Sequence, residues 1–289
     1  MGMDHVVIIP ARNEARFIED TLTSLVQQTR APDRVIVVDD GSEDETAEIV
    51  AAFARRHASV SLLKGTKFAE RRYKVVDVFN QAYGQVKSEE LTYISKIDAD
   101  QLFPADYFET LLGMLDEDAS IAVGCGTLYE DINGRLERWR TPPNHVPGAL
   151  KTYRKSVFDE IGGFIPVLGW DIIDLVKVRS LGYRNISVPT LKVVHRRRHA
   201  SAGGILKGNV RMGRGAYTIG SHPLFALGRS VYRMLEPPYV IAGLAFGYGF
   251  LKSWIAGAEQ IADRELIGAL RAEQLYRLFH RNQLPEGQS

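Results

Sequence analysis

The chain has 289 residues, of which 45% are hydrophobic and 25% are charged, enough for one large α/β domain or for one domain with an appendage. Its 36 Lys and Arg nearly balance its 35 Asp and Glu, so the overall charge does not indicate a nucleic acid or another polyanion as the partner. The single cysteine, Cys125, excludes an internal disulfide and a thiolate metal cluster.

The first hundred residues alternate strand and helix patterns with short connections. Helices are predicted to start at Asn13, at a capping box formed by Ser42 and Glu45, and at Tyr73. Apolar runs predict strands over residues 5–9, 34–40, 60–64, 91–98 and 121–129. This order indicates an α/β protein with a mainly parallel sheet that is flanked by helices on both faces.

Polar residues follow the first four predicted strands where each one ends. The four ends read PARNE, DDGSED, KGT and DAD. Sheets of this kind bind ligands at the carboxyl ends of their strands, so these loops are predicted to meet over a single site.

The DAD end contains Asp98 and Asp100, whose carboxylates would repel each other by roughly 4 kcal/mol at an effective dielectric of about 20. A divalent cation on oxygen ligands, Mg²⁺ or Mn²⁺, would remove that repulsion. The alternative is that the two aspartates cap a helix or lie in a solvated turn.

Three segments resemble the family 2 glycosyltransferases, which have the Rossmann-like GT-A fold. The segments read VIIPARNEARFIEDTLTSLVQQT, VIVVDDGSEDET and KIDADQLFP, in matching order and spacing from Val6 to Pro104. The resemblance implies a nucleotide-diphosphate-sugar donor, with UDP expected rather than GDP, and Mn²⁺ or Mg²⁺ as the cofactor. Asp98 is then expected near the donor sugar, and Asp100 at the divalent ion.

The same resemblance assigns the first two strand ends to the nucleotide. Asp39 or Asp40 would lie around the base and ribose, together with four residues of the first loop: Pro10, Ala11, Arg12 and Glu14. The alternatives are a capping turn for the two aspartates, and the start of a surface helix for Arg12 and Glu14.

The segment KFAERRYKVVDVFNQA departs from the family pattern, in which a stretch with Gly and Lys precedes a helix that ends in an asparagine. Asn80 fits this pattern, and Lys74 matches it only loosely. Lys67, Arg71 and Arg72 are the other candidates for contacts to phosphate.

The segment GGFIPVLGWDIIDLVKVRSLGYRN, residues 162–185, resembles the acceptor segment of the same family. Asp171 is the candidate general base that removes the proton of an acceptor hydroxyl, and Asp174 competes for that role. Alternatively, Asp171 caps a helix and Asp174 lies in its first turn. Trp170 is either an aromatic platform for a sugar ring or a core residue.

A further predicted strand, LKVVH, ends at His195. In relatives a histidine at this place can complete the metal site, so His195 is expected beside Asp100. The basic residues that follow could hold the donor diphosphate or an anionic acceptor, or form a solvated loop; they are Arg196, Arg197, Arg198 and His199.

The C-terminal part is basic and apolar. Residues 190–235 contain nine Lys or Arg and no acid. The apolar run over 237–251 is shorter than the roughly 20 residues that span a bilayer. An amphipathic helix is predicted from Leu224, Phe225, Leu227, Val231 and Leu235, with Arg229 and Arg233 among them. Peripheral contact with the inner face of the cell membrane is therefore predicted for a cytoplasmic protein. A helical subdomain or a dimer contact is the alternative.

These observations predict a GT-A catalytic domain over residues 1–200, with a nucleotide-sugar half over 1–104 and an acceptor half over 105–200, and a helical extension over 201–289. The expected activity is inverting, metal-dependent transfer of a sugar to a saccharide or lipid-linked saccharide in surface glycan synthesis. A polyprenyl-phosphate sugar synthase would use the same donor. A non-catalytic module that binds anionic ligands is the remaining alternative, and it leaves the acidic strand ends unexplained.

Overall fold

The computed structural model describes residues 4–65, 74–132, 135–139, 141, 145–196, 204–235 and 237–280. By packing, the chain divides into two compact units. The first unit comprises Met1–Phe164 and Tyr183–Arg198, and the second comprises Ile165–Gly182 and His199–Ser289. These units are defined by contacts alone, so the functional boundary near residue 200 stays a prediction.

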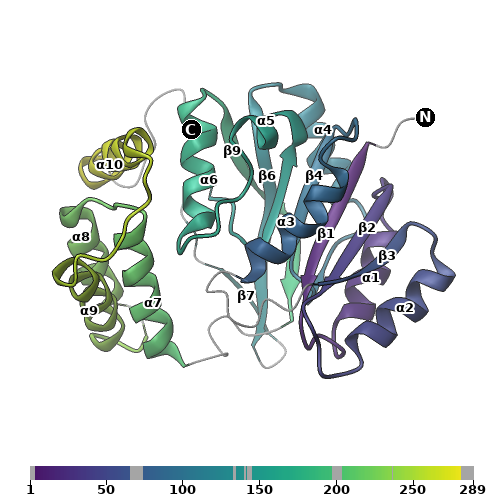
Figure 1. Cartoon of the computed structure of the whole chain (residues 1–289), viewed down its shortest axis with the longest axis horizontal. Coiled ribbons are helices and arrows are strands. Elements are labelled where there is room, and N and C mark those ends of the chain that lie inside the picture. The colour runs from purple at the N-terminus through teal and green to yellow at the C-terminus, as the bar shows by residue number, and fades with distance from the viewer. Residues whose placement is uncertain are drawn as a thin grey trace. The chain divides into compact units, whose positions relative to one another are not determined.

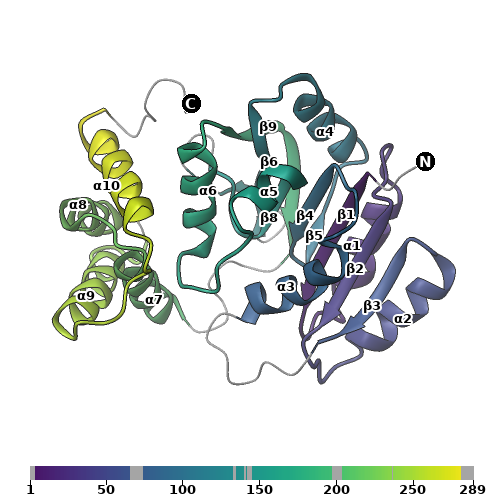
Figure 2. The same cartoon turned by 45° about the horizontal axis from the view of Figure 1, so that its top comes forward.

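The first unit is built on one sheet of nine strands, in the order β3-β2-β1-β4-β8-β6-β9-β5, with β7 paired to β6. Figure 1 and Figure 2 show this sheet with helices on both of its faces. The strands are β1 His5–Ala11, β2 Arg34–Asp39, β3 Val60–Lys64, β4 Tyr93–Ile97, β5 Gln101–Leu102, β6 Ile121–Ile132, β7 Arg135–Arg138, β8 Leu150–Arg154 and β9 Arg184–His195.

Strands β1 to β4 pair in parallel with one another, as their apolar sequences predict. The other half of the sheet is mixed, because β8 runs antiparallel to β4 and β6 whereas β6 and β9 are parallel. Residues 6–9 of β1 are fully buried, which is typical of a strand covered on both faces. The helices of this unit are α1 Ile18–Val26, α2 Thr46–Arg56, α3 Lys74–Val86, α4 Tyr107–Glu117 and α5 Lys155–Glu160.

Two predicted helix starts are wrong, because the side chains involved connect loops instead of capping helices. The first helix begins at Ile18 rather than at Asn13, which has a positive φ of 55°. The Asn13 N–H donates to Ser42 Oγ over 3.0 Å, and Asn13 Oδ1 accepts the Glu43 N–H over 2.8 Å. The capping box at residues 42–45 is absent, since α2 begins at Thr46 and Ser42 is bound to Asn13 and Asp39.

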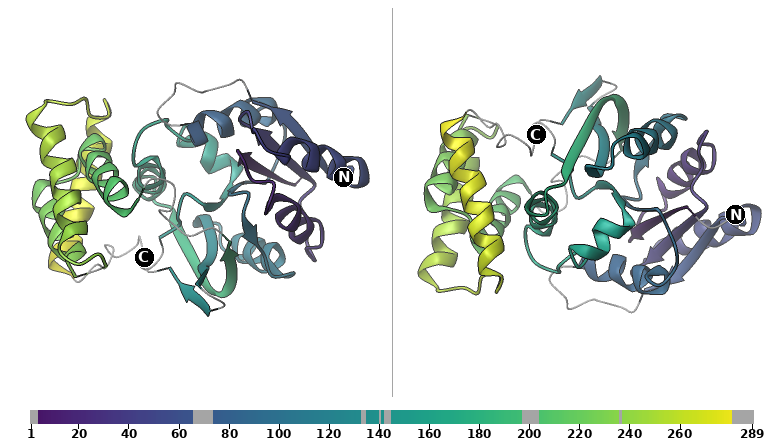
Figure 3. Two further views of the ribbon diagram at one scale, coloured as in Figure 1. Left: turned by 90° about the horizontal axis from the view of Figure 1, so that it is seen from below. Right: turned by 90° about the horizontal axis from the view of Figure 1, so that it is seen from above.

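The second unit is helical. Its helices are α6 Trp170–Ser180, α7 Ile205–Thr218, α8 Pro223–Arg233, α9 Ile241–Ile255 and α10 Arg264–Phe279. Figure 3 shows α7 to α10, coloured green to yellow, as a group of adjacent helices in both views. None of the helices within the described ranges is long and apolar enough to cross a membrane.

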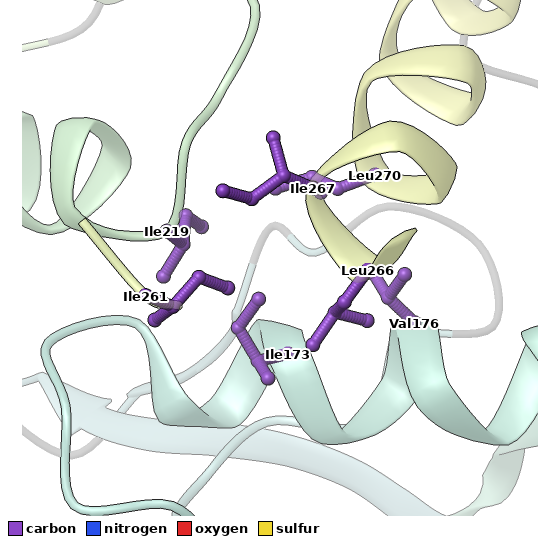
Figure 4. Packing of buried hydrophobic residues seen from close by; sticks show 7 residues of the cluster. All are labelled: Ile173, Val176, Ile219, Ile261, Leu266, Ile267 and Leu270. Carbon is purple, nitrogen blue, oxygen red and sulfur yellow. The ribbon is translucent and has the colours of Figure 1, made fainter. Parts of the chain in front are cut away.

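Two kinds of packing hold the second unit together. Apolar side chains from α6, α10 and the connections beside them form one cluster (Figure 4), which consists of Ile173, Val176, Ile219, Ile261, Leu266, Ile267 and Leu270. Helices α7 and α9 instead meet through glycines. A Cβ on Gly213 would lie 2.0 Å from the Phe246 carbonyl oxygen, and one on Gly249 would lie 2.2 Å from that of Val210. Only glycine allows these two helices to approach so closely.

A buried ion pair connects α6 to α10. Arg179 Nε and Nη2 donate to the two carboxylate oxygens of Glu273 over 2.7 Å and 2.8 Å. The side chains are only 4% and 9% exposed. This bidentate pair links α6 to α10 with defined geometry.

Candidate functional site

The candidate site begins where β4 ends. Asp98 follows β4 directly, and Asp100 precedes the short strand β5. The helix-cap alternative for these aspartates is wrong, because the next helix, α4, begins only at Tyr107. Strand β5 pairs antiparallel with β9 and places Gln101 opposite His195. This pairing brings the end of β9 to the DAD end, although the two are about 95 positions apart in the chain.

Asp98, Asp100 and His195 lie together, as the family resemblance implies. His195 Nε2 is 3.4 Å from Asp100 Oδ1 and 3.8 Å from Asp98 Oδ2. One potential ligand atom from each residue lies within 4.8 Å of the other two. The side chains of Asp100 and His195 are 6% and 9% exposed, whereas that of Asp98 is 33% exposed.

This donor set fits a divalent cation of the Mg²⁺ or Mn²⁺ kind. Two carboxylates supply hard oxygen ligands, and an imidazole nitrogen is also accepted by Mn²⁺. Because the three potential ligands come from two segments held by strand pairing, their arrangement needs no large rearrangement around an ion. That Asp100 and His195 are the ligands stays a prediction.

Lys96 is a member of this site that the sequence analysis missed. It lies inside β4, its side chain is 3% exposed, and its ammonium contacts Asp98 Oδ1. It also donates to the Gly148 carbonyl oxygen over 2.7 Å. Lys151, which lies opposite Lys96 in the β4–β8 register, is buried as well. The one available signal was a lysine within the apolar run YISKI, where a strand covered on both faces rarely has a charge.

Lys96 also determines the charge state of Asp98. Burial raises the pKa of the Asp98 carboxyl, but the positive charge of Lys96 and the hydrogen bond from His195 outweigh that effect. The pKa of Asp98 is therefore below its ordinary value, and the carboxyl is ionised near neutral pH. The site thus keeps a carboxylate at its most exposed corner.

The first two strand ends lie at the same edge of the sheet. Ala11, next to Pro10 at the end of β1, is in register with Asp39 at the end of β2. The Asp40 N–H donates to the Ala11 carbonyl oxygen over 2.9 Å. Asp39 and Asp40 are buried, at 8% and 7% exposure. Asp39 Oδ1 accepts the Ser42 N–H over 3.1 Å, a bond within the turn after β2 that caps no helix, since α2 begins at Thr46.

Arg12 and Glu14 contact other residues of the protein just before α1. Arg12 is 3.8 Å from Glu43, and both side chains are exposed. The Glu14 N–H donates to Thr46 Oγ1 over 2.8 Å, and its carbonyl oxygen accepts the Ile18 N–H. Because this bond leads directly into α1, the surface-helix alternative stays open. Their donor-binding role stays a prediction.

The basic candidates are only partly described. Arg196 binds Asp20 over 3.1 Å and lies over the Phe17 ring. Asn80 donates to the Phe164 carbonyl oxygen over 3.1 Å, which gives it a structural contact. Several other candidates lie outside the described residues, namely Lys67, Arg71, Arg72, Arg197, Arg198 and His199. The side chain of Lys74 is likewise not described.

Trp139 is a second residue that the sequence analysis missed. Its ring centroid lies 5.3 Å from that of His195, and its backbone N–H donates to the Leu128 carbonyl oxygen over 2.9 Å. Trp139 therefore limits the orientation of the His195 ring. Nothing in the local sequence indicates this contact, because it depends on the pairing of β6 with β9.

The acceptor candidates begin α6 in the second unit. The helix starts at Trp170, after Gly169 with a positive φ of 86°. Asp171 lies in the first turn and is half-buried, whereas Asp174 is 2% exposed. The helix-cap alternative for Asp171 is wrong, because Gly169 occupies the capping position. Trp170 is half-buried, which leaves both of its alternatives open.

Comparison with known proteins agrees with this architecture. Residues 6–168 match the family model of glycosyl transferase family 2. The uncharacterized glycosyltransferase EpsJ of Bacillus subtilis is 28% identical over 142 residues, which are 47% of this chain and 37% of EpsJ. The undecaprenyl-phosphate 4-deoxy-4-formamido-L-arabinose transferase of Edwardsiella ictaluri is 26% identical over 230 residues, which are 70% of this chain and 63% of that protein.

The fold is similar to that of solved glycosyltransferases. The mannosyltransferase PcManGT from Pyrobaculum calidifontis, in complex with GDP-Man and Mn²⁺, superposes with a TM-score of 0.57 at 19% identity, over 98% of this chain and 82% of that one. This likeness confirms the GT-A fold. The family model covers more than half of the chain, and the chain therefore belongs to glycosyl transferase family 2.

Proposed function

We propose that the chain moves a sugar from a nucleotide-diphosphate-sugar to a saccharide or lipid-linked saccharide in surface glycan synthesis. UDP is the preferred nucleotide in this proposal, ahead of GDP. The observation that carries it is the cluster of Asp98, Asp100 and His195, whose potential ligand atoms lie within 4.8 Å of one another at the end of β4.

In this proposal Asp100 and His195 hold Mn²⁺ or Mg²⁺, with Asp98 beside them. When bound, such an ion neutralises the negative charge that a diphosphate gains as it leaves. Asp98, the most exposed of the three, orients the donor sugar. The Lys96 ammonium contacts the Asp98 carboxylate and keeps it in position.

The nucleotide is assigned to the first two strand ends. Pro10, Ala11 and the buried pair Asp39 and Asp40 line one edge of the sheet. A carboxylate at a strand end accepts hydrogen bonds from a ribose or a base. Arg196 is proposed at the diphosphate, which requires that it leave its contact with Asp20.

The acceptor hydroxyl is assigned to α6. Asp171 acts as the general base that takes the hydroxyl proton, so that the oxygen attacks the sugar from the side opposite the leaving group and the anomeric configuration inverts. Its partial exposure in the first turn of α6 favours it over Asp174, which is buried. Trp170 is proposed as the platform for the acceptor ring.

A polyprenyl-phosphate sugar synthase is the second candidate. It is favoured by the similarity to the undecaprenyl-phosphate transferase of Edwardsiella ictaluri. A phosphate acceptor is already ionised at neutral pH, so this reaction would need no general base.

Asp171→Asn distinguishes the two candidates, with Asp174→Asn as the matched control. Each variant is incubated with UDP- and GDP-sugars, Mn²⁺ and either a lipid-linked saccharide or a polyprenyl phosphate. Product formation is followed by mass spectrometry. Transfer to a hydroxyl should fall by about 10²–10⁴-fold in Asp171→Asn, with nucleotide binding unchanged.

Substantial transfer to the lipid phosphate by Asp171→Asn would favour the synthase. Loss of nucleotide binding in that variant would refute the role of Asp171 as a base.

We also propose that the protein acts at the inner face of the cell membrane.

A further inference from the structure

Helices α8 and α9 expose apolar side chains in regular helical stripes. On α9 the stripe contains Ile241, Leu244, Tyr248, Leu251 and Ile255, which are 52–86% exposed and spaced by three or four positions. On α8 and the turn after it, Leu224, Leu227, Val231 and Leu235 are 53–72% exposed, with similar spacing. Such spacing places the residues of each stripe along one side of its helix.

The apolar stripes are not the sides by which these helices pack within their own unit. The opposite side of α9 is already filled, since Gly243, Phe246, Gly249 and Phe250 are buried. A Cβ on Gly243 would lie 2.2 Å from the Ser230 carbonyl oxygen of α8, so α8 and α9 are also in close contact. Folding of this unit therefore does not explain why the outer side is apolar.

The exposed apolar surface of the two stripes is extensive. Each stripe side chain is more than half exposed. Together they present on the order of several hundred Å² of apolar surface, which in soluble proteins marks an interaction site. We call the two stripes together the α8–α9 face.

The charge of the segment that contains this face favours an anionic lipid surface as its partner. Residues 204–258 contain six Lys or Arg and one acid, Glu236. Lys207, Arg211, Arg214 and Lys252 are exposed. A second copy of the chain would bring the same cations against these, whereas an anionic leaflet attracts each of them by about 1 kcal/mol.

The aromatic residues agree with a lipid interface. Trp254, Tyr232, Tyr239 and Tyr248 are 51–65% exposed. Trp and Tyr are enriched at the headgroup level of membranes, because their rings contact the apolar side while their polar atoms contact water. Helix α9 has 15 residues and is about 22 Å long, shorter than the roughly 30 Å of a hydrocarbon core.

We propose that the α8–α9 face docks onto the surface of an anionic lipid bilayer, with both helices lying in the interface plane. The proposal deepens the proposed function, since membrane contact would hold the enzyme where a lipid-linked acceptor is presented. The docking itself depends on neither donor nor acceptor.

The test measures binding of the whole protein to sedimented vesicles, without nucleotide-sugar. Vesicles of phosphatidylcholine alone are compared with vesicles that contain about 30% phosphatidylglycerol. Binding to the anionic vesicles should be strong, and should weaken as salt is raised. Leu244→Glu combined with Leu251→Glu should reduce it by about tenfold or more.

Leu136→Glu is the matched control, because Leu136 on β7 is 53% exposed but lies in the first unit. It should leave vesicle binding unchanged. Both variants change exposed side chains, and circular dichroism with thermal unfolding checks that each one folds. Because vesicle binding is measured without substrates, its failure is distinguishable from failure of the transferase activity.

Two outcomes would overturn the proposal. One is a wild-type protein that does not bind anionic vesicles. The other is a dimer, seen by sedimentation velocity and abolished by the Leu244→Glu and Leu251→Glu pair, in a protein whose vesicle binding those changes do not affect. That result would assign the α8–α9 face to a second copy of the chain.

Discussion

Replacing Asp98 should damage the fold as well as the site, because Asp98 is the partner of a buried cation. The Lys96 side chain is 3% exposed and contacts Asp98 Oδ1. Breaking a buried pair costs about 3–5 kcal/mol. Since Asp98 is 33% exposed, water screens part of the interaction, and about 2–3 kcal/mol is expected for Asp98→Asn.

Replacing Lys96 instead of Asp98 should lower the free energy of unfolding by less. In Lys96→Met the remaining charge is on Asp98, which water can reach, so about 1 kcal/mol is expected. Combining Lys96→Met with Asp98→Asn removes both charges and should restore stability to within about 1 kcal/mol of the wild type. Sugar transfer should stay absent in the double variant, because the donor-orienting carboxylate is still missing.

Urea unfolding of the four proteins forms a double-mutant cycle that measures this coupling. Sugar transfer is assayed on the same samples. The reasoning fails if Asp98→Asn is as stable as the wild type, or if the double variant is less stable than Asp98→Asn. Recovery of transfer in the double variant would show that Asp98 acts only as a structural partner of Lys96.

Two further predictions concern packing and pH. Gly249→Ala should lower the free energy of unfolding by about 1–3 kcal/mol, because its Cβ would lie 2.2 Å from a carbonyl oxygen of α7. Gly208→Ala should not lower the free energy of unfolding, because nothing lies within 4 Å of the new Cβ. Equal thermal stability of the two variants would contradict the close packing at Gly249. Burial lowers the pKa of His5 from its ordinary 6.5 to about 3, so between these values only the unfolded chain takes up the proton, and stability falls as the pH falls. His5→Gln should therefore reduce the slope of unfolding free energy against pH by about 1.4 kcal/mol per unit between about pH 4 and 6, as measured by urea titration, and an unchanged slope would mean that folded His5 is charged.

Strands β1 to β4, β6 and the end of β9 could be predicted because their signals are local. A run such as residues 34–40 is apolar wherever the rest of the chain lies, and the parallel pairs of β1 to β4 follow from alternation with helices. The outward apolar spacing of Leu224, Leu227 and Val231 was also local, and these residues are exposed on α8.

Features that depend on distant contacts could not be predicted from the residues alone. The position of His195 beside Asp100 follows from the β5–β9 pairing, and it was expected only because relatives have a histidine there. Asn13 and Ser42 have the residue types of helix starts, yet they bind each other across two loops. Lys96 contacts Asp98 in the folded protein. A lysine within an apolar run does not indicate which residue its ammonium contacts.

The most direct test of a cation site at the DAD end is calorimetric binding of UDP and GDP, each with Mn²⁺ and with a chelator. Wild type is compared with Asp100→Ala and with Asp106→Ala, a control at an exposed aspartate whose side chain makes no capping bond to α4. One nucleotide, expected to be UDP, should bind only with Mn²⁺, and Asp100→Ala alone should lose that binding. Equal binding with the chelator, or unchanged binding in Asp100→Ala, would contradict a metal-dependent donor site at Asp98, Asp100 and His195.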